Sequence, residues 1–345
     1  MTVLHVVLPG DVDDPATPSG GNRYDRRVCD GLRAAGWDVR EHPVPGGWPA
    51  PGHGDRAALA ALLDALPDAA LVLLDGLVAS AVPEVLAPRA GRLRPVVLVH
   101  LPLETEAEAR ALAAVAGVVT TSEWTRRRLL ERYPLPADRV RVAAPGTDPA
   151  PRAAGSATGT SLLCVAALTP HKGHDVLATA LAELAALPWT CDLVGALTRD
   201  PAYVDRLRRQ LADAGLAARV RLRGPRTGAA LDAAYAGADL LVLPSRGETY
   251  GMVVTEALAR GVPVLGTDAG GLPEALGHAP DGRRPGLLVP PGDPTALAGA
   301  LRRWLTEPDL RSRLRAAARA RRDTLTDWAV TTTRLAAAVK ETTAT

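Results

Sequence analysis

The sequence predicts an α/β protein with two doubly wound parallel sheets that face each other across a ligand-binding cleft. Three observations predict this fold class. Short apolar runs alternate with amphipathic segments of helical length along the whole chain. The alternation stops once, in a segment rich in Pro, Ala, Gly, Ser and Thr at Pro149–Thr160, and then starts afresh. With 345 residues, the chain is long enough for two domains of ordinary size.

The amino-terminal half shows the alternation clearly, and loops rich in Gly and Pro separate its first elements. The expected strands are Val3–Leu8, Trp37–Val44, Ala70–Leu74, Pro95–His100, Val118–Thr121 and Val140–Ala144. The expected helices are Asn22–Ala35, Asp55–Leu66, Leu77–Leu86, Glu104–Ala116 and Glu123–Arg132. Strands that alternate with helices in this way indicate a parallel sheet with right-handed crossovers.

The carboxy-terminal half repeats the pattern. The expected strands are Leu162–Leu168, Cys191–Val194, Val220–Arg223, Asp239–Leu243, Val262–Leu265 and Leu287–Val289. The expected helices are Asp175–Leu187, Pro201–Gly215, Ala229–Ala236, one that carries Glu256, Pro294–Trp304, Pro308–Arg322 and Asp327–Val339. We therefore expect an amino-terminal domain at residues 1–150, a linker at 151–160, a carboxy-terminal domain at 161–325 and a final helix at 326–345 that packs back on the amino-terminal domain.

Composition excludes several classes of protein. A formal net charge of +2 and an aromatic content of 3% give no basis for nucleic-acid binding. No apolar stretch is long enough to span a membrane, and no signal peptide precedes the first strand, so we expect a cytoplasmic protein. The arginine-rich region at 302–322 indicates a solvated helix face more than a lipid-binding surface. The three cysteines, Cys29, Cys164 and Cys191, form no CxxC pair, and neither disulfides nor a zinc site are expected.

The most informative stretch is Pro244–Glu274, PSRGETYGMVVTEALARGVPVLGTDAGGLPE. It predicts a strand end, a loop with Glu248, a helix with Glu256 and a second strand. The loop of such a crossover lies at the carboxyl edge of the sheet, where open α/β folds bind ligands. Free backbone amides at the helix N-terminus favour an anion, and carboxylates accept hydrogen bonds from sugar or ribose hydroxyls. The alternative is that Glu248 is a solvated loop residue and Glu256 an ordinary surface residue of the helix.

This stretch resembles the donor-site signature of the family 4 retaining glycosyltransferases, which have the GT-B fold. The resemblance implies that Glu248 contacts hexose hydroxyls and that Glu256 contacts the ribose of the nucleotide. It also implies a donor site made by the residues from the loop into the helix, namely Thr249, Tyr250, Gly251, Met252 and Val253. Tyr250 stands where the family often has Phe.

A second segment, Leu162–Leu177, resembles the phosphate loop of the same family. The resemblance implies that Lys172 contacts the diphosphate of the donor. The alternative is a lysine near a helix N-terminus that Asp175 caps. The family commonly has arginine where this chain has Ala167, which leaves one cation of the usual pair. The histidines on either side of the lysine, His171 and His174, are interpreted as loop residues, since no third metal ligand accompanies them.

The amino-terminal half carries weaker signals. Glycines between a strand and a helix let a backbone approach a ligand, and the resemblance implies that Gly20 and Gly21 face the donor phosphates and the acceptor. Their neighbours Asn22, Arg23 and Tyr24 are candidate acceptor contacts.

Two residues at strand ends complete the candidate site. The resemblance implies that His100 lies beside the reacting sugar and supports catalysis, whereas a lone histidine at a strand end is more often a packed or capping residue. Asp75 is a candidate on the acceptor side. The aspartates Asp11, Asp13 and Asp14 could be mistaken for a metal site but are interpreted as solvated loop charges.

The resemblance therefore implies a retaining, metal-independent transferase without a cofactor. It would move a hexose from a UDP- or GDP-linked sugar to a small-molecule, glycan or lipid-linked acceptor, without nucleic acid as a partner. Two alternatives stay open. One is a GT-B protein that binds a sugar nucleotide without transferring the sugar, which the alanine at position 167 favours. The other is a sugar-nucleotide epimerase or hydrolase, or a phosphorylase.

Overall fold

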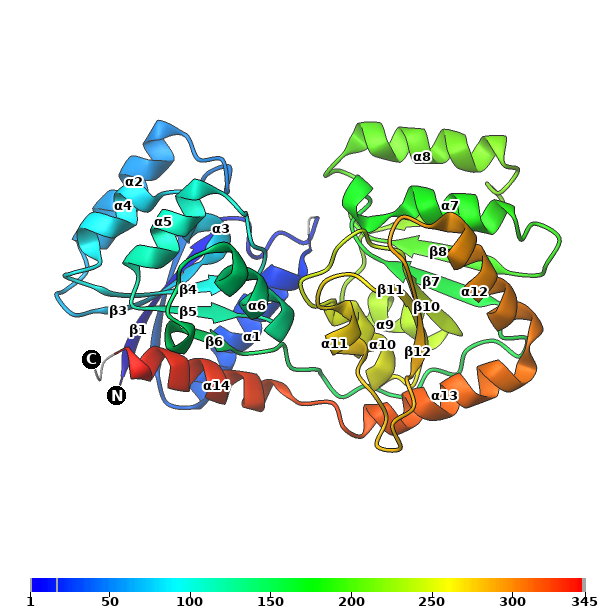
Figure 1. The fold of residues 1–345 in the computed structure, drawn as a ribbon. Coiled ribbons are helices and arrows are strands. Elements are labelled where there is room, and N and C mark those ends of the chain that lie inside the picture. The colour runs from blue at the N-terminus through cyan, green and yellow to red at the C-terminus, as the bar shows by residue number, and fades with distance from the viewer. Residues whose placement is uncertain (1, 17, 343–345) are drawn as a thin grey trace. The chain divides into compact units, whose positions relative to one another are not determined.

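The computed structural model describes residues 2–16 and 18–342. These residues form two compact units, each built around its own six-stranded parallel sheet (Figure 1). The amino-terminal unit contains residues 2–14, 20–146 and 327–342, and the carboxy-terminal unit contains residues 147–326 with the short segment that precedes Gly20. The two doubly wound sheets confirm the expected fold class.

The amino-terminal sheet has the strand order β2-β1-β3-β4-β5-β6, and every neighbouring pair is parallel. Its strands are β1 (Val3–Pro9), β2 (Asp38–Val44), β3 (Leu71–Asp75), β4 (Arg94–Val99), β5 (Gly117–Thr120) and β6 (Val140–Val142). The chain moves to one side of β1 for β2 and to the other side for β3. The connections from β1 and β3 therefore leave in opposite directions, which opens a crevice at their carboxyl ends.

Two helical layers cover this sheet, one with α1 and α14 and one with α2, α4 and α5. The helices are α1 (Gly20–Ala34), α2 (His53–Asp64), α3 (Gly76–Ala79), α4 (Pro83–Leu86), α5 (Glu106–Ala114), α6 (Glu123–Arg132) and α14 (Trp328–Glu341), with short 3₁₀ turns at Ala87–Arg89 and Ala137–Arg139. The single helix expected at 77–86 is wrong. Val82 has a non-helical backbone and Pro83 starts α4, because proline cannot continue a helix that needs its amide.

The last helix, α14, packs on α1 within the amino-terminal unit. Glycine at position 31 makes the close approach possible, since a Cβ there would lie 2.2 Å from the Thr332 hydroxyl oxygen. Leu335 is fully buried on the inner face of α14, and the Thr331 hydroxyl donates to the Ala144 carbonyl at 2.8 Å. This helix is therefore part of the amino-terminal core.

The carboxy-terminal sheet has the strand order β12-β11-β10-β7-β8-β9, again parallel throughout. Its strands are β7 (Ser161–Val165), β8 (Thr190–Val194), β9 (Val220–Gly224), β10 (Leu240–Leu243), β11 (Val264–Thr267) and β12 (Gly286–Val289). The order reverses between β7 and β10. The two most informative sequence stretches follow these two strands, so both emerge at this switch point.

Helices α7, α8 and α12 form one layer on this sheet, and α10, α11 and α13 pack together in another (Figure 1). The helices are α7 (His174–Ala182), α8 (Pro201–Asp213), α9 (Gly228–Ala236), α10 (Met252–Ala259), α11 (Leu272–Leu276), α12 (Pro294–Thr306) and α13 (Pro308–Arg322), with a 3₁₀ turn at Pro170–Lys172. The sequence analysis missed α11, a single turn after two glycines.

Residues 151–160 contain no helix or strand, and a buried carboxylate attaches them to the carboxy-terminal unit. Asp239 accepts hydrogen bonds from the Ser156 and Ser161 amides at 3.0 and 2.9 Å, and it pairs with Arg315 at 2.8 Å. All three cysteines are buried and free. Within the described residues, no helix combines the length and the apolar character needed to cross a bilayer.

Candidate active site

The loop after β10 is shaped by glycines at both of its ends. Gly251 has φ of +93° and begins α10 without any side-chain cap, so the first amides of the helix are left for another acceptor. A Cβ at Gly270 would lie 1.9 Å from the Glu248 carbonyl oxygen, and one at Gly271 would lie 2.2 Å from the Thr249 carbonyl oxygen. The Gly271 amide donates to the Glu248 carbonyl at 2.7 Å. The glycine pair before α11 therefore holds the loop that carries Glu248.

The side chain of Glu248 is fixed by two donors at the same oxygen. Lys172 Nζ lies 2.6 Å and the Ser245 hydroxyl 2.7 Å from its Oε1. Ser245 is in turn held through its carbonyl, which accepts from the Thr267 hydroxyl at 2.6 Å. The side chains of Glu248 and Lys172 are 10% and 27% exposed, so the alternative of a solvated loop carboxylate is wrong. One carboxylate oxygen holds the cation and the other is left for a ligand.

The phosphate loop lies directly against the loop after β10. Gly173 has φ of +70°, and a Cβ there would lie 2.0 Å from the Pro244 carbonyl oxygen. The Arg246 amide donates to the His171 carbonyl at 2.8 Å, and the Arg246 guanidinium pairs with Asp175 at 2.7 Å. The alternative in which Asp175 caps the helix is wrong, because Gly173 is the N-cap of α7 and the Asp175 carboxylate pairs with Arg246. This arrangement places both predicted donor loops in one surface.

The interpretation of His174 as a loop residue is also wrong. It is the first residue of α7, and 1% of its surface is exposed. Neither of its ring nitrogens has a hydrogen-bond partner in the described part of the chain. Burial lowers the pKa of His174 to about 4, so the ring is neutral and serves as a core residue beside the phosphate loop.

Glu256 lies on the buried side of α10. The residue is 9% exposed, which excludes the alternative of an ordinary surface position. Its Oε2 accepts a hydrogen bond from the hydroxyl of Tyr235 at 2.9 Å. The Arg260 guanidinium lies over the Tyr235 ring at 4.6 Å and donates to the Glu256 carbonyl at 2.9 Å. Tyr235 and Arg260 therefore fix the orientation of the second carboxylate.

Position 167, where the resemblance suggests an arginine, lies two residues beyond the end of β7. Its neighbourhood is tight, because a Cβ at Gly195 would lie 1.9 Å from the Ala166 carbonyl oxygen and 2.9 Å from the Ala167 amide nitrogen. Arg246 does not take over the missing charge, since its guanidinium binds Asp175 and the Pro170 carbonyl. Lys172 is thus the cation of this loop that faces Glu248.

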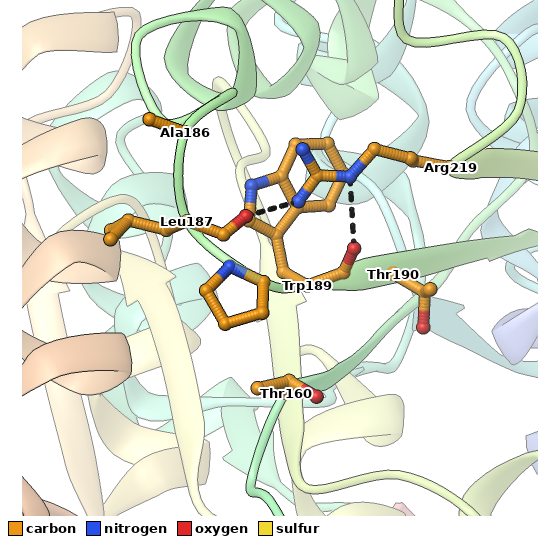
Figure 2. Close-up of a pocket in the computed structure, with 7 residues that line it drawn as sticks. Thr160, Ala186, Leu187, Trp189, Thr190 and Arg219 are labelled. Atoms are coloured by element: carbon orange, nitrogen blue, oxygen red, sulfur yellow. Dashed lines mark hydrogen bonds between the residues drawn. The ribbon is translucent and has the colours of Figure 1, made fainter.

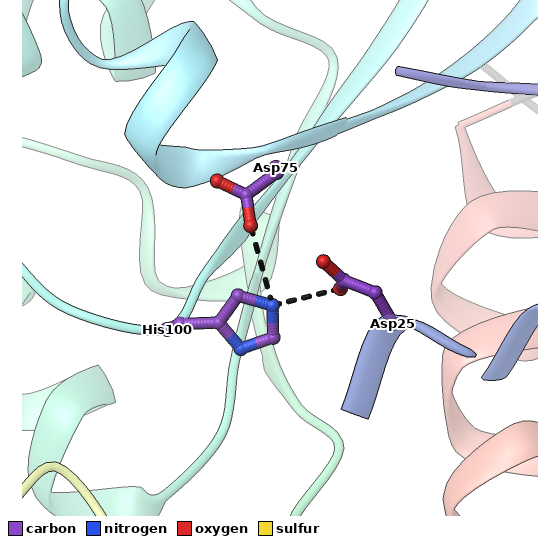
Figure 3. A group of neighbouring side chains, drawn as sticks. All are labelled: Asp25, Asp75 and His100. Carbon is purple, nitrogen blue, oxygen red and sulfur yellow. Dashed lines mark hydrogen bonds and ion pairs between the residues drawn. The ribbon is translucent and has the colours of Figure 1, made fainter. Parts of the chain in front are cut away.

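In the amino-terminal unit, three ionisable side chains meet at the carboxyl ends of β3 and β4 (Figure 3). His100 Nε2 lies 2.8 Å from Asp25 Oδ1 and 3.5 Å from Asp75 Oδ2. Asp75 ends β3, His100 follows β4, and Asp25 lies on α1. We call Asp25, Asp75 and His100 the amino-terminal cluster. Their ligand atoms all lie within 4.8 Å, so these residues could also hold a metal ion.

The glycines of the first loop shape this cluster. Gly20 and Gly21 are the first residues of α1 and not part of a loop, which differs from the expectation. A Cβ at Gly21 would lie 3.4 Å from the His100 ring, in van der Waals contact, so the start of α1 lies directly beside the imidazole. Tyr24 packs its ring edgewise on His100 at 5.1 Å and donates its hydroxyl to the Ala143 carbonyl at 2.8 Å. Tyr24 is fully buried and packs against one side of the amino-terminal cluster.

The other predicted residues of this unit lie at its surface. The Asn22 side chain donates to the Asp11 carbonyl at 3.2 Å, and Asp13 pairs with Arg26 at 2.6 Å. Arg23 is half-buried on α1. Asp13 is therefore a loop charge with a basic partner.

Burial and neighbouring charges set the protonation of the cluster. Burial lowers the pKa of His100, but the charge and hydrogen bond of Asp25 and the charge of Asp75 raise it, and the balance is about 8. Burial and the negative charge of Asp25 raise the pKa of Asp75 to about 7. At neutral pH the imidazole is therefore protonated and is balanced by a buried carboxylate.

Sequence analysis missed three residues that shape the two sites: Asp25, Ser245 and Tyr235. Asp25 left a signal, since it stands among Val28, Cys29 and Leu32 on the buried stripe of α1, where a charge is unexpected. Ser245 and Tyr235 left none, because their importance depends on which carboxylate they contact in three dimensions.

A shallow hollow of about 540 Å³ lies elsewhere, near Trp189 at the start of β8 (Figure 2). The Arg219 guanidinium stacks on the Trp189 ring at 3.7 Å and donates to the carbonyls of Trp189 and Ala185 at 3.1 and 2.7 Å. These bonds tie the loop before β8 to the turn before β9. The hollow is at the amino edge of the sheet, opposite the edge that carries Glu248, and its arginine is engaged by the protein itself.

Comparison with known proteins agrees with this geometry. Residues 153–321 match the family model described as Glycosyl transferases group 1. The D-inositol 3-phosphate glycosyltransferase of Jonesia denitrificans is 33% identical over 233 residues, which are 61% of this chain and 54% of that protein. The chain thus spans about half the length of the curated relatives it matches.

Two solved structures have the same fold over essentially the whole chain. Sucrose-phosphate synthase from Thermosynechococcus elongatus superposes with a TM-score of 0.79 at 22% identity, and the match covers 100% of each chain. Anabaena HepE in complex with UDP and glucose superposes with a TM-score of 0.75 at 19% identity, and the match covers 99% of each chain. The GT-B fold expected from the sequence is confirmed.

Proposed function

Because its residues 153–321 match the family model described as Glycosyl transferases group 1, we propose that this protein is a member of that family, a retaining, metal-independent glycosyltransferase that moves a hexose from a nucleotide diphosphate sugar to an acceptor hydroxyl. The finer assignment to family 4 is consistent with that match. The ion pair of Lys172 with Glu248 carries the proposal, because it joins the two predicted donor loops at 2.6 Å beside the uncapped N-terminus of α10.

Each residue has a separate role in this mechanism. Lys172 and the amides of Gly251, Met252 and Val253 neutralise the charge that develops on the leaving diphosphate. Glu248 accepts hydrogen bonds from the hexose through the oxygen that Lys172 does not occupy, and Glu256 accepts them from the ribose. The leaving diphosphate takes the proton of the attacking acceptor hydroxyl on the same face of the sugar, so the anomeric configuration is retained without a protein nucleophile.

The amino-terminal unit supplies the acceptor side. His100 hydrogen-bonds a hydroxyl of the hexose, and Gly20 and Gly21 face the donor phosphates. The acceptor-side candidates are Asn22, Arg23, Tyr24 and Asp75. The first donors to test are UDP- and GDP-hexoses, since Anabaena HepE is solved with UDP and glucose. The first acceptor to test is D-inositol 3-phosphate, which the similar proteins carry in their name.

Purified protein tests the proposal with these donors and acceptors in the presence of EDTA. Lys172→Ala and Glu248→Ala should each lower turnover by at least about a hundredfold while circular dichroism stays unchanged. Arg208→Ala is the matched control, since this exposed arginine of the same unit pairs only with its helix neighbour Asp205 among the described residues. Wild-type turnover by either site variant would refute the assignment, and NMR of the product gives the anomeric configuration.

Ala167 supports a second candidate, a protein that binds the sugar nucleotide without transferring the sugar. Calorimetry separates the two, since this candidate predicts donor binding by the wild type with neither transfer nor hydrolysis. Activity gained on Ala167→Arg would show that the missing cation limits transfer.

A further inference from the structure

Asp25 occupies a position at which a charge is costly. It lies on the inner face of α1 among Tyr24, Val28 and Cys29, and it is 3% exposed. An isolated ionised carboxylate at such depth would shift its equilibrium toward the neutral acid. A charged partner beside Asp25 would offset this cost, and contact with that partner would be the reason for a carboxylate at this position.

That partner is His100. Asp25 Oδ1 lies 2.8 Å from His100 Nε2, whereas Asp25 Oδ2 is buried and has no hydrogen-bond partner in the described part of the chain. Asp75 faces the same ring nitrogen from 3.5 Å, but its Oδ1 is already engaged by the Leu77 amide at 2.6 Å, where it caps α3. Asp25 is thus the closer carboxylate and the one bound to the imidazole.

The other contacts of the His100 ring involve its carbon atoms and Nε2, and they leave the second nitrogen, Nδ1, for a ligand. The edge of Tyr24 lies against the imidazole at 5.1 Å between ring centroids, and the helix start at Gly21 lies against its carbon side. With Nε2 given to the carboxylates, Nδ1 is the nitrogen that can reach a ligand (Figure 3). A bond from Nε2–H to Asp25 also fixes the tautomer of the neutral ring.

We propose that Asp25 is a positioning residue for His100: it holds the ring through Nε2 and, together with Asp75, keeps the imidazole protonated, so that Nδ1–H is presented to the substrate as a hydrogen-bond donor. The inference rests on the proposed function, in which His100 contacts the hexose. It deepens that function by making His100 a cationic donor and not a base.

The chemistry of the bound group follows from this charge state. A protonated Nδ1 binds an oxygen with lone pairs, such as a sugar hydroxyl oxygen, and it favours one on which negative charge increases during transfer. The groups that face the ring and set its charge are Asp25 on α1 and Asp75 at the end of β3, with Tyr24 bonded away to a backbone carbonyl.

NMR tests the positioning role without any activity assay. The chain has seven histidines, so the Cε1–H signal of His100 is assigned by its loss in His100→Gln, and its titration is followed in wild type, Asp25→Asn and Asp75→Asn. We expect the midpoint to fall by at least about one pH unit in Asp25→Asn and by less in Asp75→Asn. An unchanged midpoint in a folded Asp25→Asn variant would overturn the proposal.

Kinetics test the consequence for transfer. Asp25→Asn should lower kcat by about tenfold to a hundredfold with little change in donor KM. It should also move the alkaline limb of the pH profile to lower pH, and Asp25→Asn should add nothing to His100→Gln. Asp13→Asn is the matched control, because this aspartate of the same unit is exposed. Additive effects of the two substitutions would overturn the link between Asp25 and His100.

Further outcomes separate the two proposals. If the NMR midpoint falls as expected but the variants turn over like wild type, His100 does not act in transfer and the catalytic part of the inference is overturned. If no donor supports transfer by wild type, the proposed function fails while the NMR result still decides the role of Asp25. A stoichiometric divalent metal that wild type carries and Asp25→Asn lacks would also overturn the inference. Where Asp25→Asn does not fold, Asp25→Ser gives the same NMR test, because it also removes the carboxylate beside His100.

Discussion

His100 and His174 are both largely buried histidines, one in each unit, and the structure gives them opposite charge states. His100 lies between two carboxylates, which raise its pKa to about 8. His174 has no hydrogen-bond partner for either ring nitrogen within the described residues, and burial lowers its pKa to about 4. At neutral pH the His100 ring is a cation, whereas the His174 ring is neutral and packs in the core.

The difference shows that the charge of a histidine is decided by what the fold places around it. His100 directly follows the apolar strand β4 and precedes Leu101 and Pro102, whereas His174 follows Gly173 in a polar stretch. His100 contacts carboxylates on α1 and at the end of β3. His174 is the first residue of α7 and is buried in the core of the carboxy-terminal unit. The charged pair of the carboxy-terminal unit differs from both histidines. The side chain of Lys172 is 27% exposed and that of its partner Glu248 is 10% exposed, so a ligand can reach the pair.

Removing the cation from the amino-terminal cluster should have the largest effect. His100→Leu leaves two carboxylates buried without a balancing charge, which should cost about 3–5 kcal/mol of unfolding free energy at pH 7, where the wild-type imidazole is protonated. The loss should be smaller at pH 5, because Asp75, whose pKa is raised to about 7, takes up a proton there. Urea unfolding measures both values, with His53→Leu as an exposed control in the same unit. Equal losses at both pH values would mean that the histidine acts by packing and not by charge.

The stability of the two units should respond to pH in opposite directions. The folded-state pKa of His100 lies above 6.5, so its stabilisation is present below pH 6.5 and is lost as pH rises through 8. The raised pKa of Asp75 acts in the same direction between about pH 4 and 7. The folded-state pKa of His174 lies below 6.5, so its stabilisation is present above pH 6.5 and is lost as pH falls towards 4.

Hydrogen exchange resolves these two responses, after correction for the pH dependence of the intrinsic rates. The slope contributed by one site should reach at most about 1.4 kcal/mol per pH unit. His174→Leu is the matched variant, because it should remove the acid sensitivity of the carboxy-terminal unit and leave the amino-terminal unit unchanged. A common response of both units in wild type would contradict the assigned charge states.

The smallest effect should come from an ion pair that water can reach. Arg246 and Asp175 have side chains that are 40% and 36% exposed, so Arg246→Gln should cost less than about 1 kcal/mol of unfolding free energy. A double-mutant cycle with Asp175→Asn in urea unfolding measures the coupling. A coupling as large as the cost of His100→Leu would show that burial does not separate the two kinds of pair.

The fold was predictable to a large extent because both sheets are parallel. A strand buried on both faces reads as a continuous apolar run, and eight of the twelve strands in the described residues are hydrophobic over more than half of their length. The sequence analysis was wrong where a local breaker outweighed the pattern, as at Pro83. It also placed Gly20 and Gly21 in a loop, because glycine has a low helix propensity, whereas both residues begin α1.

The donor side of the site was more predictable than the amino-terminal side. Glu248, Glu256 and Lys172 lie in contiguous segments whose local order already implies a strand, a loop and a helix start. Their fixing contacts were not predictable, because Ser245 and Tyr235 act through the carboxylates they touch. On the amino-terminal side, Asp25, Asp75 and His100 come from three distant segments, and only the strand order β1-β3-β4 brings their carboxyl ends together.

The sequence by itself determined the alternation of strands and helices, the two halves, the glycines that the loops need and the choice of candidate donor-site residues. These features depend on short-range periodicity and on backbone conformations that few residues adopt. The charge of each buried group was decided by the tertiary structure alone, since burial and electrostatic coupling depend on distances between side chains. His100 is a cation because the sheet order places Asp25 and Asp75 beside it, and His174 is neutral because α7 buries it without a partner.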